Sequence, residues 1–139
     1  MSWQSYVESL MAEGTCQDAA IVGYGDAKYV WASLSGGTFA NITPAEIDVM
    51  VAKERDSFFT QGLTLGNKKC SVLRDSLNVD GDWTMDFRTK NQDGGPTYNI
   101  SVARTDKVLV LVMGKASTHG GVLNKQAYGM AEYLRRSGY

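Results

Sequence analysis

The chain has 139 residues, of which 43% are hydrophobic and 21% are charged, and its formal net charge at pH 7 is −1. This length suits a single domain over residues 1–139 that buries a core without disulfide staples. The near balance of 14 basic and 15 acidic residues argues against a protein that binds nucleic acid through bulk charge. No apolar run reaches the roughly 20 residues that span a bilayer. With no secretory signal pattern and two isolated cysteines, the sequence predicts a cytoplasmic protein.

The N-terminal third predicts a helix and then a β-hairpin. Apolar residues recur at helical spacing from Trp3 to Met11, with Ser2 placed to cap this helix and Gly14 placed to end it. Two apolar runs, residues 19–24 and 28–34, flank a Gly-Asp-Ala segment and predict two strands joined by a short turn.

The segment TPAE at residues 43–46 predicts the start of a second helix. Its Thr is an N-cap, its Pro suits the first turn, and its Glu completes a capping box. The apolar face of this helix would consist of Ile47, Met50 and Val51.

The remainder predicts four strands and a final helix. The strands are KCSVLR (69–74), WTMDFR (83–88), TYNISV (97–102) and KVLVLVM (107–113), with turns at Asp80-Gly81 and in NQDGGP (91–96). Apolar and polar residues alternate in the middle two strands, which predicts an antiparallel meander with one polar face. From about His119 a helix follows, with a core stripe of Leu123, Ala127, Met130 and Leu134. The predicted fold class is α+β, a central antiparallel sheet of about six or seven strands with the N- and C-terminal helices packed together on one face and shorter helices on the other.

No sequence motif is typical of an enzyme. His119 is the only histidine and both cysteines are isolated, which argues against a zinc site, and no G-x-S-x-G nucleophile elbow is present. We therefore expect no metal and no cofactor, and interpret the chain as a recognition module. Two alternatives stay open: a small-ligand sensor, which would need a cavity among Trp83, Phe87 and Tyr98 that we expect to be filled, and a hydrolase built around His119.

Aromatic residues gather at both ends of the chain. They are Trp3, Tyr6, Tyr133 and Tyr139. If the terminal helices lie side by side, these rings meet, and Tyr29 and Trp31 of the hairpin join them, although alternation does not fix the face of Trp31. The rings either seal the helices onto the sheet, the commoner role of such a stripe, or form a groove of parallel rings. That groove would suit a polyproline II ligand, to whose carbonyls Trp N–H and Tyr O–H groups would donate.

Motifs spread along the chain resemble vertebrate profilins. In order, they are CQDAAIVGY, NITPAEI, FFTQGLTLG, KKCSVLRDSL, MDFRTK, GGPTYN, LVLVMGK, HGGVLNK and YLRRSGY. DAKYVWA, KQAYGMAEYL and the acidic pI are more similar to the brain-type second isoform than to the ubiquitous one. The resemblance implies a cytoplasmic, cytoskeletal protein that binds monomeric actin, promotes nucleotide exchange and delivers ATP-actin to barbed ends. It also implies binding to proline-rich segments of formins and related actin-assembly proteins and, weakly and peripherally, to phosphoinositide membranes.

The resemblance further implies which residues bind each ligand. The proline groove would comprise Trp3, Tyr6, Tyr29, Trp31, Tyr133, Leu134 and Tyr139. The actin face would comprise Phe59, Lys69, Ser71, Val72, Leu73, Arg74, Lys90, Thr97, Asn99, His119, Gly121, Asn124 and Lys125. Phosphoinositides would meet one basic patch of Lys69, Arg74, Arg88, Lys90 and Lys125 and another of Arg135 and Arg136 near the groove. For the actin residues and for the phosphoinositide residues, the alternative is a solvated surface that binds no partner.

Two positions depart from the family pattern. The family often has His where this chain has Tyr133, and because Tyr keeps a flat face and a donor, the groove should be preserved. Gly129 stands where a well-studied member has an acidic actin contact, which predicts somewhat weaker actin binding.

Overall fold

The computed structural model describes residues 2–91 and 94–139. Met1 and two residues of the predicted NQDGGP turn, Gln92 and Asp93, lie outside the described residues. In chain order the elements are α1 (Trp3–Ala12), β1 (Cys16–Gly23), β2 (Val30–Ser33), a 3-10 helix η1 (Thr38–Asn41), α2 (Pro44–Val51), α3 (Phe58–Gln61), β3 (Leu63–Leu65), β4 (Lys68–Ser76), β5 (Thr84–Thr89), β6 (Asn99–Arg104), β7 (Val108–Gly114) and α4 (Gly120–Arg136).

The strands form one antiparallel sheet in the order β2-β1-β7-β6-β5-β4-β3. β1 and β7 pair inside the sheet, where Ile21 is opposite Val110, so a strand from the N-terminal part of the chain neighbours one from the C-terminal part. The predicted hairpin and the predicted meander are both confirmed. The edge strand β3 was not predicted, because three residues are too few to show an alternation.

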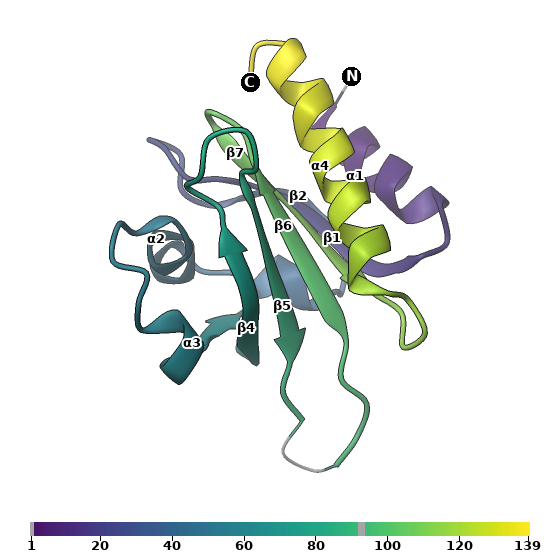
Figure 1. The fold of residues 1–139 in the computed structure, drawn as a ribbon. Helices are drawn as coiled ribbons and strands as arrows, with labels where there is room; N and C mark the ends of the chain where they lie inside the picture. Colours follow the sequence, from purple (N-terminus) through teal and green to yellow (C-terminus); the bar gives the residue numbers. More distant parts are fainter. Residues whose placement is uncertain (1, 92–93) are drawn as a thin grey trace.

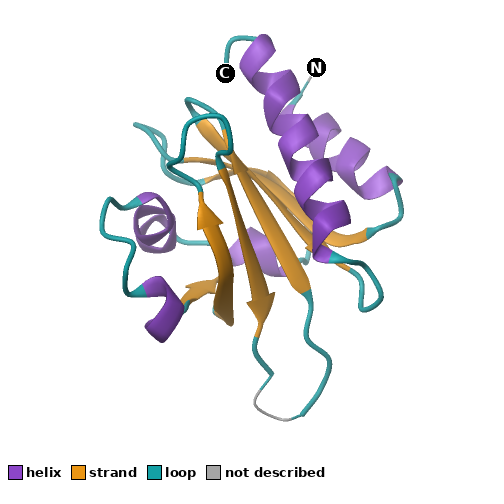
Figure 2. Ribbon diagram, in the orientation of Figure 1, coloured by secondary structure: helices purple, strands orange, loops and turns teal. Residues whose placement is uncertain are grey.

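Helices cover both faces of the sheet (Figures 1 and 2). α1 and α4 lie next to each other on one face, whereas α2 and α3 lie on the opposite face, and the two termini end close together (Figure 1). This arrangement confirms the predicted α+β architecture. It matters for function because it brings the aromatic residues of both chain ends to one edge of the molecule.

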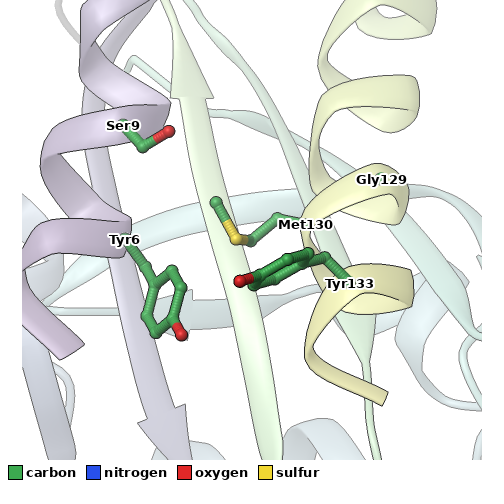
Figure 3. Close-up of a pocket in the computed structure, with 5 residues that line it drawn as sticks. All are labelled: Tyr6, Ser9, Gly129, Met130 and Tyr133. Atoms are coloured by element: carbon green, nitrogen blue, oxygen red, sulfur yellow. The ribbon is translucent and has the colours of Figure 1, made fainter. Parts of the chain in front are cut away.

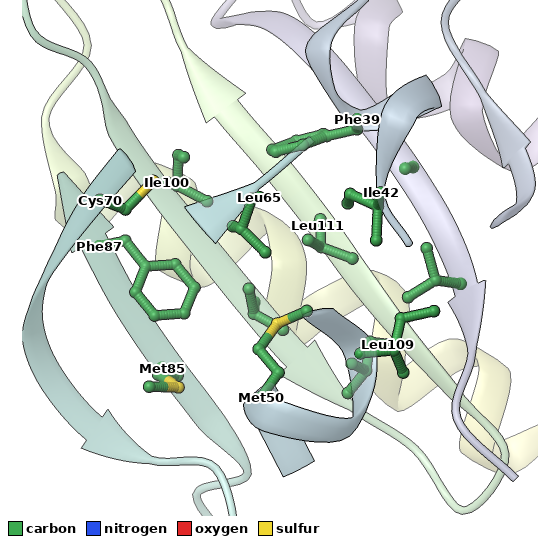
Figure 4. Packing of buried hydrophobic residues seen from close by; sticks show 14 of the residues in the cluster. Phe39, Ile42, Met50, Leu65, Cys70, Met85, Phe87, Ile100, Leu109 and Leu111 are labelled. Atoms are coloured by element: carbon green, nitrogen blue, oxygen red, sulfur yellow. The ribbon is translucent and has the colours of Figure 1, made fainter. Parts of the chain in front are cut away.

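Each face of the sheet has its own buried cluster. Between the sheet and α2 and α3, the side chains of Phe39, Met50, Leu65 and Phe87 are buried (Figure 4). Between the sheet and the terminal helices lie Val7, Leu10 and Ile21 with the apolar stripe of α4. β7 is buried along its whole length because it contributes side chains to both clusters, which explains its unbroken apolar run.

The helix starts follow the local chemistry of the sequence. The Ser2 hydroxyl accepts from the Ser5 N–H at the start of α1, and Gly14 adopts a φ of 80° after its end. At α2 the capping box of Thr43 and Glu46 is complete. Glu46 Oε1 also accepts from the Gly66 N–H at 3.0 Å, so this cap ties α2 to the β3–β4 turn.

Three details differ from the sequence prediction. α4 covers the predicted polar face of β5 and β6, so Thr84 and Ser101 on that face are buried rather than solvated. In α4, Ala131 is fully buried while Met130 is only partly buried, because the stripe faces α1 as well as the sheet. Trp83 lies before β5 at a φ of 50°, in a turn where its N–H donates to the Val79 carbonyl at 3.0 Å.

Candidate functional site

Six aromatic rings meet where the ends of α1 and α4 approach β2. The Trp3 ring lies at the centre, with centroid distances of 4.8 Å to Tyr139, 5.0 Å to Trp31 and 5.7 Å to Tyr6. Tyr29 continues the row beside Trp31 at 6.4 Å, and Tyr133 continues it beside Tyr6 at 6.0 Å. We call these six residues the aromatic groove. Trp31 therefore points to the face of the terminal helices, which alternation left open.

The sequence prediction assumed parallel rings, but the rings of the groove are inclined to one another. Their planes are inclined by 49° to 71°, and Trp3 meets Trp31 and Tyr139 edge to face. This is the arrangement that the quadrupoles of aromatic rings favour. The rings thus stabilise one another, and the groove is formed without a ligand.

The groove residues differ in how far they reach the surface. The side chains of Tyr29 and Tyr133 are exposed, and those of Trp3, Trp31 and Tyr139 are half-buried. Tyr6 is only 9% exposed. Leu134 is fully buried beneath the rings, because α4 turns this residue into the core, and its predicted contact with a ligand stays a prediction.

The hydrogen-bonding capacity of the groove is also more limited than expected. The Trp31 ring N–H already donates to the Ala27 carbonyl at 3.0 Å, so it is not free for a ligand. Within residues 2–91 and 94–139, no hydrogen-bond partner is found for the Trp3 ring N–H or the Tyr139 hydroxyl. Burial, followed by the neighbouring Tyr133 and Tyr139, raises the pKa of Tyr6 above its ordinary value of 10.0, so this phenol keeps its proton at neutral pH.

A pocket of about 240 Å³ opens between α1 and α4 at the end of the groove (Figure 3). Tyr6 and Ser9 line it from α1, and Gly129, Met130 and Tyr133 line it from α4. Sequence reasoning missed this pocket, because it treated Met130 as a core residue and considered Gly129 only as a lost acidic contact.

Polar and charged residues form a second candidate surface over β4, β5, β6 and the start of α4. Asp86 lies at its centre and accepts from Arg74 Nε at 2.9 Å, Asn124 Nδ2 at 3.1 Å and Ser101 Oγ at 2.7 Å. Asp82 approaches Arg74 from the exposed side at 3.3 Å. Asp86 thus connects three strands to α4, and neither aspartate was among the predicted site residues.

Many of the predicted actin residues lie on this surface. A hollow of about 500 Å³ is lined by Leu73, Arg74, Asp82, Asp86, Gly120, Gly121, Asn124 and Lys125. Beside it, Arg88 donates to Thr97 at 2.8 Å and to Asn99 at 3.0 Å. Asn99 in turn donates to the carbonyl of Thr118, which precedes His119 at the N-cap of α4.

The other members of the predicted actin face are more scattered. Phe59 on α3 is 61% exposed, and Lys69 and Lys90 are joined by a backbone hydrogen bond of 2.8 Å. Ser71 is half-buried on β4. Val72 is only 7% exposed and belongs to the core between the sheet and α2, and its predicted contact with actin stays a prediction.

Both predicted basic patches are altered by pairing. Burial lowers the pKa of Arg74, but the hydrogen bond and charge of Asp86, together with Asp82, outweigh burial, so the net pKa is raised. The two aspartates also offset the positive charge that Arg74 would offer a phosphate.

Arg135 and Arg136 diverge, because consecutive helix residues point about 100° apart. Arg136 pairs with Glu132 at 2.8 Å. Arg135 lies over the Trp83 ring at 4.7 Å and donates to the Arg104 carbonyl at 2.7 Å. The two side chains therefore have different surroundings, and their predicted contact with phosphoinositides stays a prediction.

The alternative functions find little support in the geometry. Phe87 is fully buried in the core, whereas Trp83 packs beneath Arg135, so these side chains do not enclose a shared sensor cavity with Tyr98. His119 is exposed at the start of α4. In the part of the chain that the structure describes, no group of three or more His, Cys, Asp or Glu side chains is placed to hold a metal ion. Nor is any described helix long and apolar enough to cross a membrane.

Comparison with known proteins agrees with these observations. The family model for profilin matches residues 1–139. Over 137 residues the chain is 67% identical to profilin-2 of Rattus norvegicus and of Homo sapiens, covering 99% of this chain and 98% of each relative. Identity to Homo sapiens profilin-1 is 60% with the same coverage, which confirms the predicted similarity to the second isoform.

Solved structures are similar over the whole chain. Mouse profilin IIa, in complex with a double repeat from the FH1 domain of mDia1, has a TM-score of 0.98 at 66% identity and covers 100% of both chains. Schizosaccharomyces pombe profilin has a TM-score of 0.74 at 30% identity, covering 99% of this chain and 100% of that one. Sequence and fold agree over the whole chain, and the chain belongs to the profilin family.

Proposed function

We propose that this chain is a non-enzymatic, cytoplasmic regulator of the actin cytoskeleton that acts as one domain over residues 1–139. It binds monomeric actin, promotes nucleotide exchange and delivers ATP-actin to barbed ends, and it binds proline-rich segments of formins and related assembly proteins. The observation that carries the proposal is the aromatic groove, in a chain 66% identical to a profilin solved with a formin FH1 repeat.

The groove has the physical properties that a polyproline II helix requires. This helix is preformed, has no internal hydrogen bonds and presents proline rings and carbonyl acceptors. Half-buried Trp3, Trp31 and Tyr139 offer ring faces, and the Trp3 N–H is a donor without a partner among the described residues. Because the rings already hold one another, little side-chain entropy is lost on binding.

Tryptophan fluorescence tests this assignment, because Trp3 and Trp31 are in the groove and Trp83 is not. Decaproline should change the emission of the wild type, and Trp3→Ala should abolish the response. Trp83→Phe is the matched control and should keep it. No spectral response at millimolar concentrations of proline residues would refute the groove.

We assign actin binding to the surface around Asp86. Apolar Leu73 is exposed there among polar groups, a composition typical of protein interfaces, and Phe59 is exposed on α3. Lys69, Lys90 and Lys125 supply charges that set association rate and register. Gel filtration with monomeric actin tests the assignment. His119→Glu should lose co-elution with actin but keep decaproline binding, and Trp3→Ala should do the reverse; loss of both ligands in either variant would contradict two separate sites.

Phosphoinositide binding is the weakest of the proposed activities. With Arg74 paired to two aspartates, the attraction rests on Lys69, Lys90, Lys125 and Arg88, which are exposed. Exposed charges are screened by salt, and the chain as a whole is slightly negative. Lipid binding should therefore be peripheral, salt-sensitive and in competition with actin, since the lysines belong to both sets.

A further inference from the structure

The pocket between α1 and α4 is continuous with the aromatic groove. Tyr6 and Tyr133 line both, and Figure 3 shows Met130 and Tyr133 extending from α4 toward Tyr6 on α1. We propose that this pocket binds one apolar side chain that flanks the proline run of a ligand, and that Gly129 keeps the pocket open. The proposal rests on the proline-binding function above and adds a determinant of ligand choice to it.

The position of the pocket fits the spacing of such a ligand. Ser9 follows Tyr6 by three residues on α1, and Met130 precedes Tyr133 by three residues on α4. Three helical residues rise by about 4.5 Å, so the pocket extends by about that distance beyond the Tyr6–Tyr133 pair. A polyproline II helix rises about 3.1 Å per residue, so the inserted side chain belongs to the residue one or two positions beyond the last proline on that pair.

The lining determines which side chain is accepted. None of the five lining residues carries a charge, and the surface consists mainly of two tyrosine rings and the Met130 thioether. A charged side chain would lose its hydration there without gaining a partner, whereas an aliphatic one is removed from water. The flexible Met130 side chain adapts to the shape of its occupant. We therefore expect leucine or methionine to be preferred over alanine and lysine.

Gly129 is the residue that leaves this space vacant. A Cβ atom at this position would meet no atom within 4 Å, so a side chain fits here without a clash. Any larger residue would occupy part of the volume that the ligand needs. A helix-interior glycine also lowers helix stability by roughly 1 kcal/mol relative to alanine, so filling the pocket should not destabilise the fold.

The test uses decaproline extended by Gly-Leu or Gly-Ala, at either the N- or the C-terminal end. At one end the leucine peptide should bind about fivefold more tightly than the alanine peptide, as expected for partial burial of the additional methylene groups. In Gly129→Leu this preference should disappear while affinity for plain decaproline is unchanged. Ala116→Leu, which adds the same side chain at an exposed turn outside the pocket, should retain the preference.

The outcomes separate the pocket from the groove. Equal affinity for leucine and alanine peptides at both ends, or a leucine preference that survives in Gly129→Leu, would overturn the pocket proposal and leave proline binding intact. Failure of plain decaproline to bind the wild type would overturn the proline-binding function and this proposal with it. Thermal unfolding of Gly129→Leu shows that any loss of preference does not reflect loss of the fold.

Discussion

Replacing Asp86 with Asn tests whether this residue organises the surface assigned to actin. The carboxylate accepts hydrogen bonds from Arg74, Asn124 and Ser101, which lie on three different elements. An asparagine of the same shape keeps one oxygen but turns an N–H₂ group toward groups that are themselves donors. At least one of these donors must then lose its acceptor.

The expected cost follows from the burial of each partner. Ser101 is 1% exposed, and a buried donor left without an acceptor costs about 1–3 kcal/mol. The side chain of Arg74 is 41% exposed, so solvent screens its ion pair and the loss there is at most about 1 kcal/mol. We expect Asp86→Asn to lower the free energy of unfolding by roughly 2 kcal/mol.

Asp82→Asn is the matched control, since Asp82 also pairs with Arg74. Its side chain is 44% exposed and its contact is longer, at 3.3 Å, and an asparagine there still offers an oxygen to Thr84. The expected cost is about 0.5 kcal/mol or less. Urea unfolding measures both variants, and a loss of 2 kcal/mol moves the midpoint by roughly 1 M at the slopes usual for small proteins.

Actin affinity gives a second measurement on the same variants. Because Asp86 orients Arg74 and Asn124, Asp86→Asn should weaken actin binding while decaproline binding stays at the wild-type level. If Asp82→Asn costs as much stability as Asp86→Asn, or if actin affinity survives the loss of Asp86, the carboxylate does not organise the surface and the reasoning fails.

Four further predictions follow from the described residues. Burial raises the pKa of Asp18 above its ordinary value of 3.8, so the stability that its protonated form contributes is present below that value and is lost as pH rises through the native pKa. The free energy of unfolding of the wild type relative to Asp18→Asn should therefore fall as the pH is raised above 3.8, and a rise would contradict this sign. Burial raises the pKa of Cys70 to about 12, so a thiol reagent at about pH 8 should label Cys70 only in urea; rapid labelling of the native protein would refute its burial. Gly129→Glu should raise actin affinity in sedimentation assays if this position contacts actin, and unchanged or lower affinity would count against the contact. Binding to phosphoinositide vesicles should decline steeply as salt is raised, and binding retained at about 1 M salt would contradict an electrostatic origin.

Elements with a strong local signal could be predicted from the sequence. The capping box at Thr43 and Glu46 specifies its helix through side chains three residues apart, and the structure confirms it. β3, in contrast, has three residues and exists because β4 pairs with it, while α3 has only four. Such short elements depend on tertiary neighbours that a single sequence does not reveal.

The Arg74–Asp86 pair could not be predicted for a similar reason. Alternation along β4 and β5 would place residues opposite one another in a regular ladder. The observed register shifts between Val72 and Arg74, so Leu73 has no partner on β5 and Arg74 lies opposite Asp86. This bulge exposes Leu73, buries Val72 and forms the ion pair, and no periodicity in the sequence marks it.

α4 connects the two candidate surfaces and explains how they can operate independently. Its side chains Leu123, Ala127, Ala131 and Leu134 are fully buried against the sheet, so the helix is held along its length. Asn124 projects from its first half to Asp86, whereas Met130 and Tyr133 project from its second half toward α1. A ligand on one side meets a preformed surface and needs no movement of the other. Under the proposed function, one chain can therefore hold an actin monomer and a proline-rich segment at the same time. The affinity for actin should depend on the salt concentration, whereas the affinity for the proline-rich segment should not.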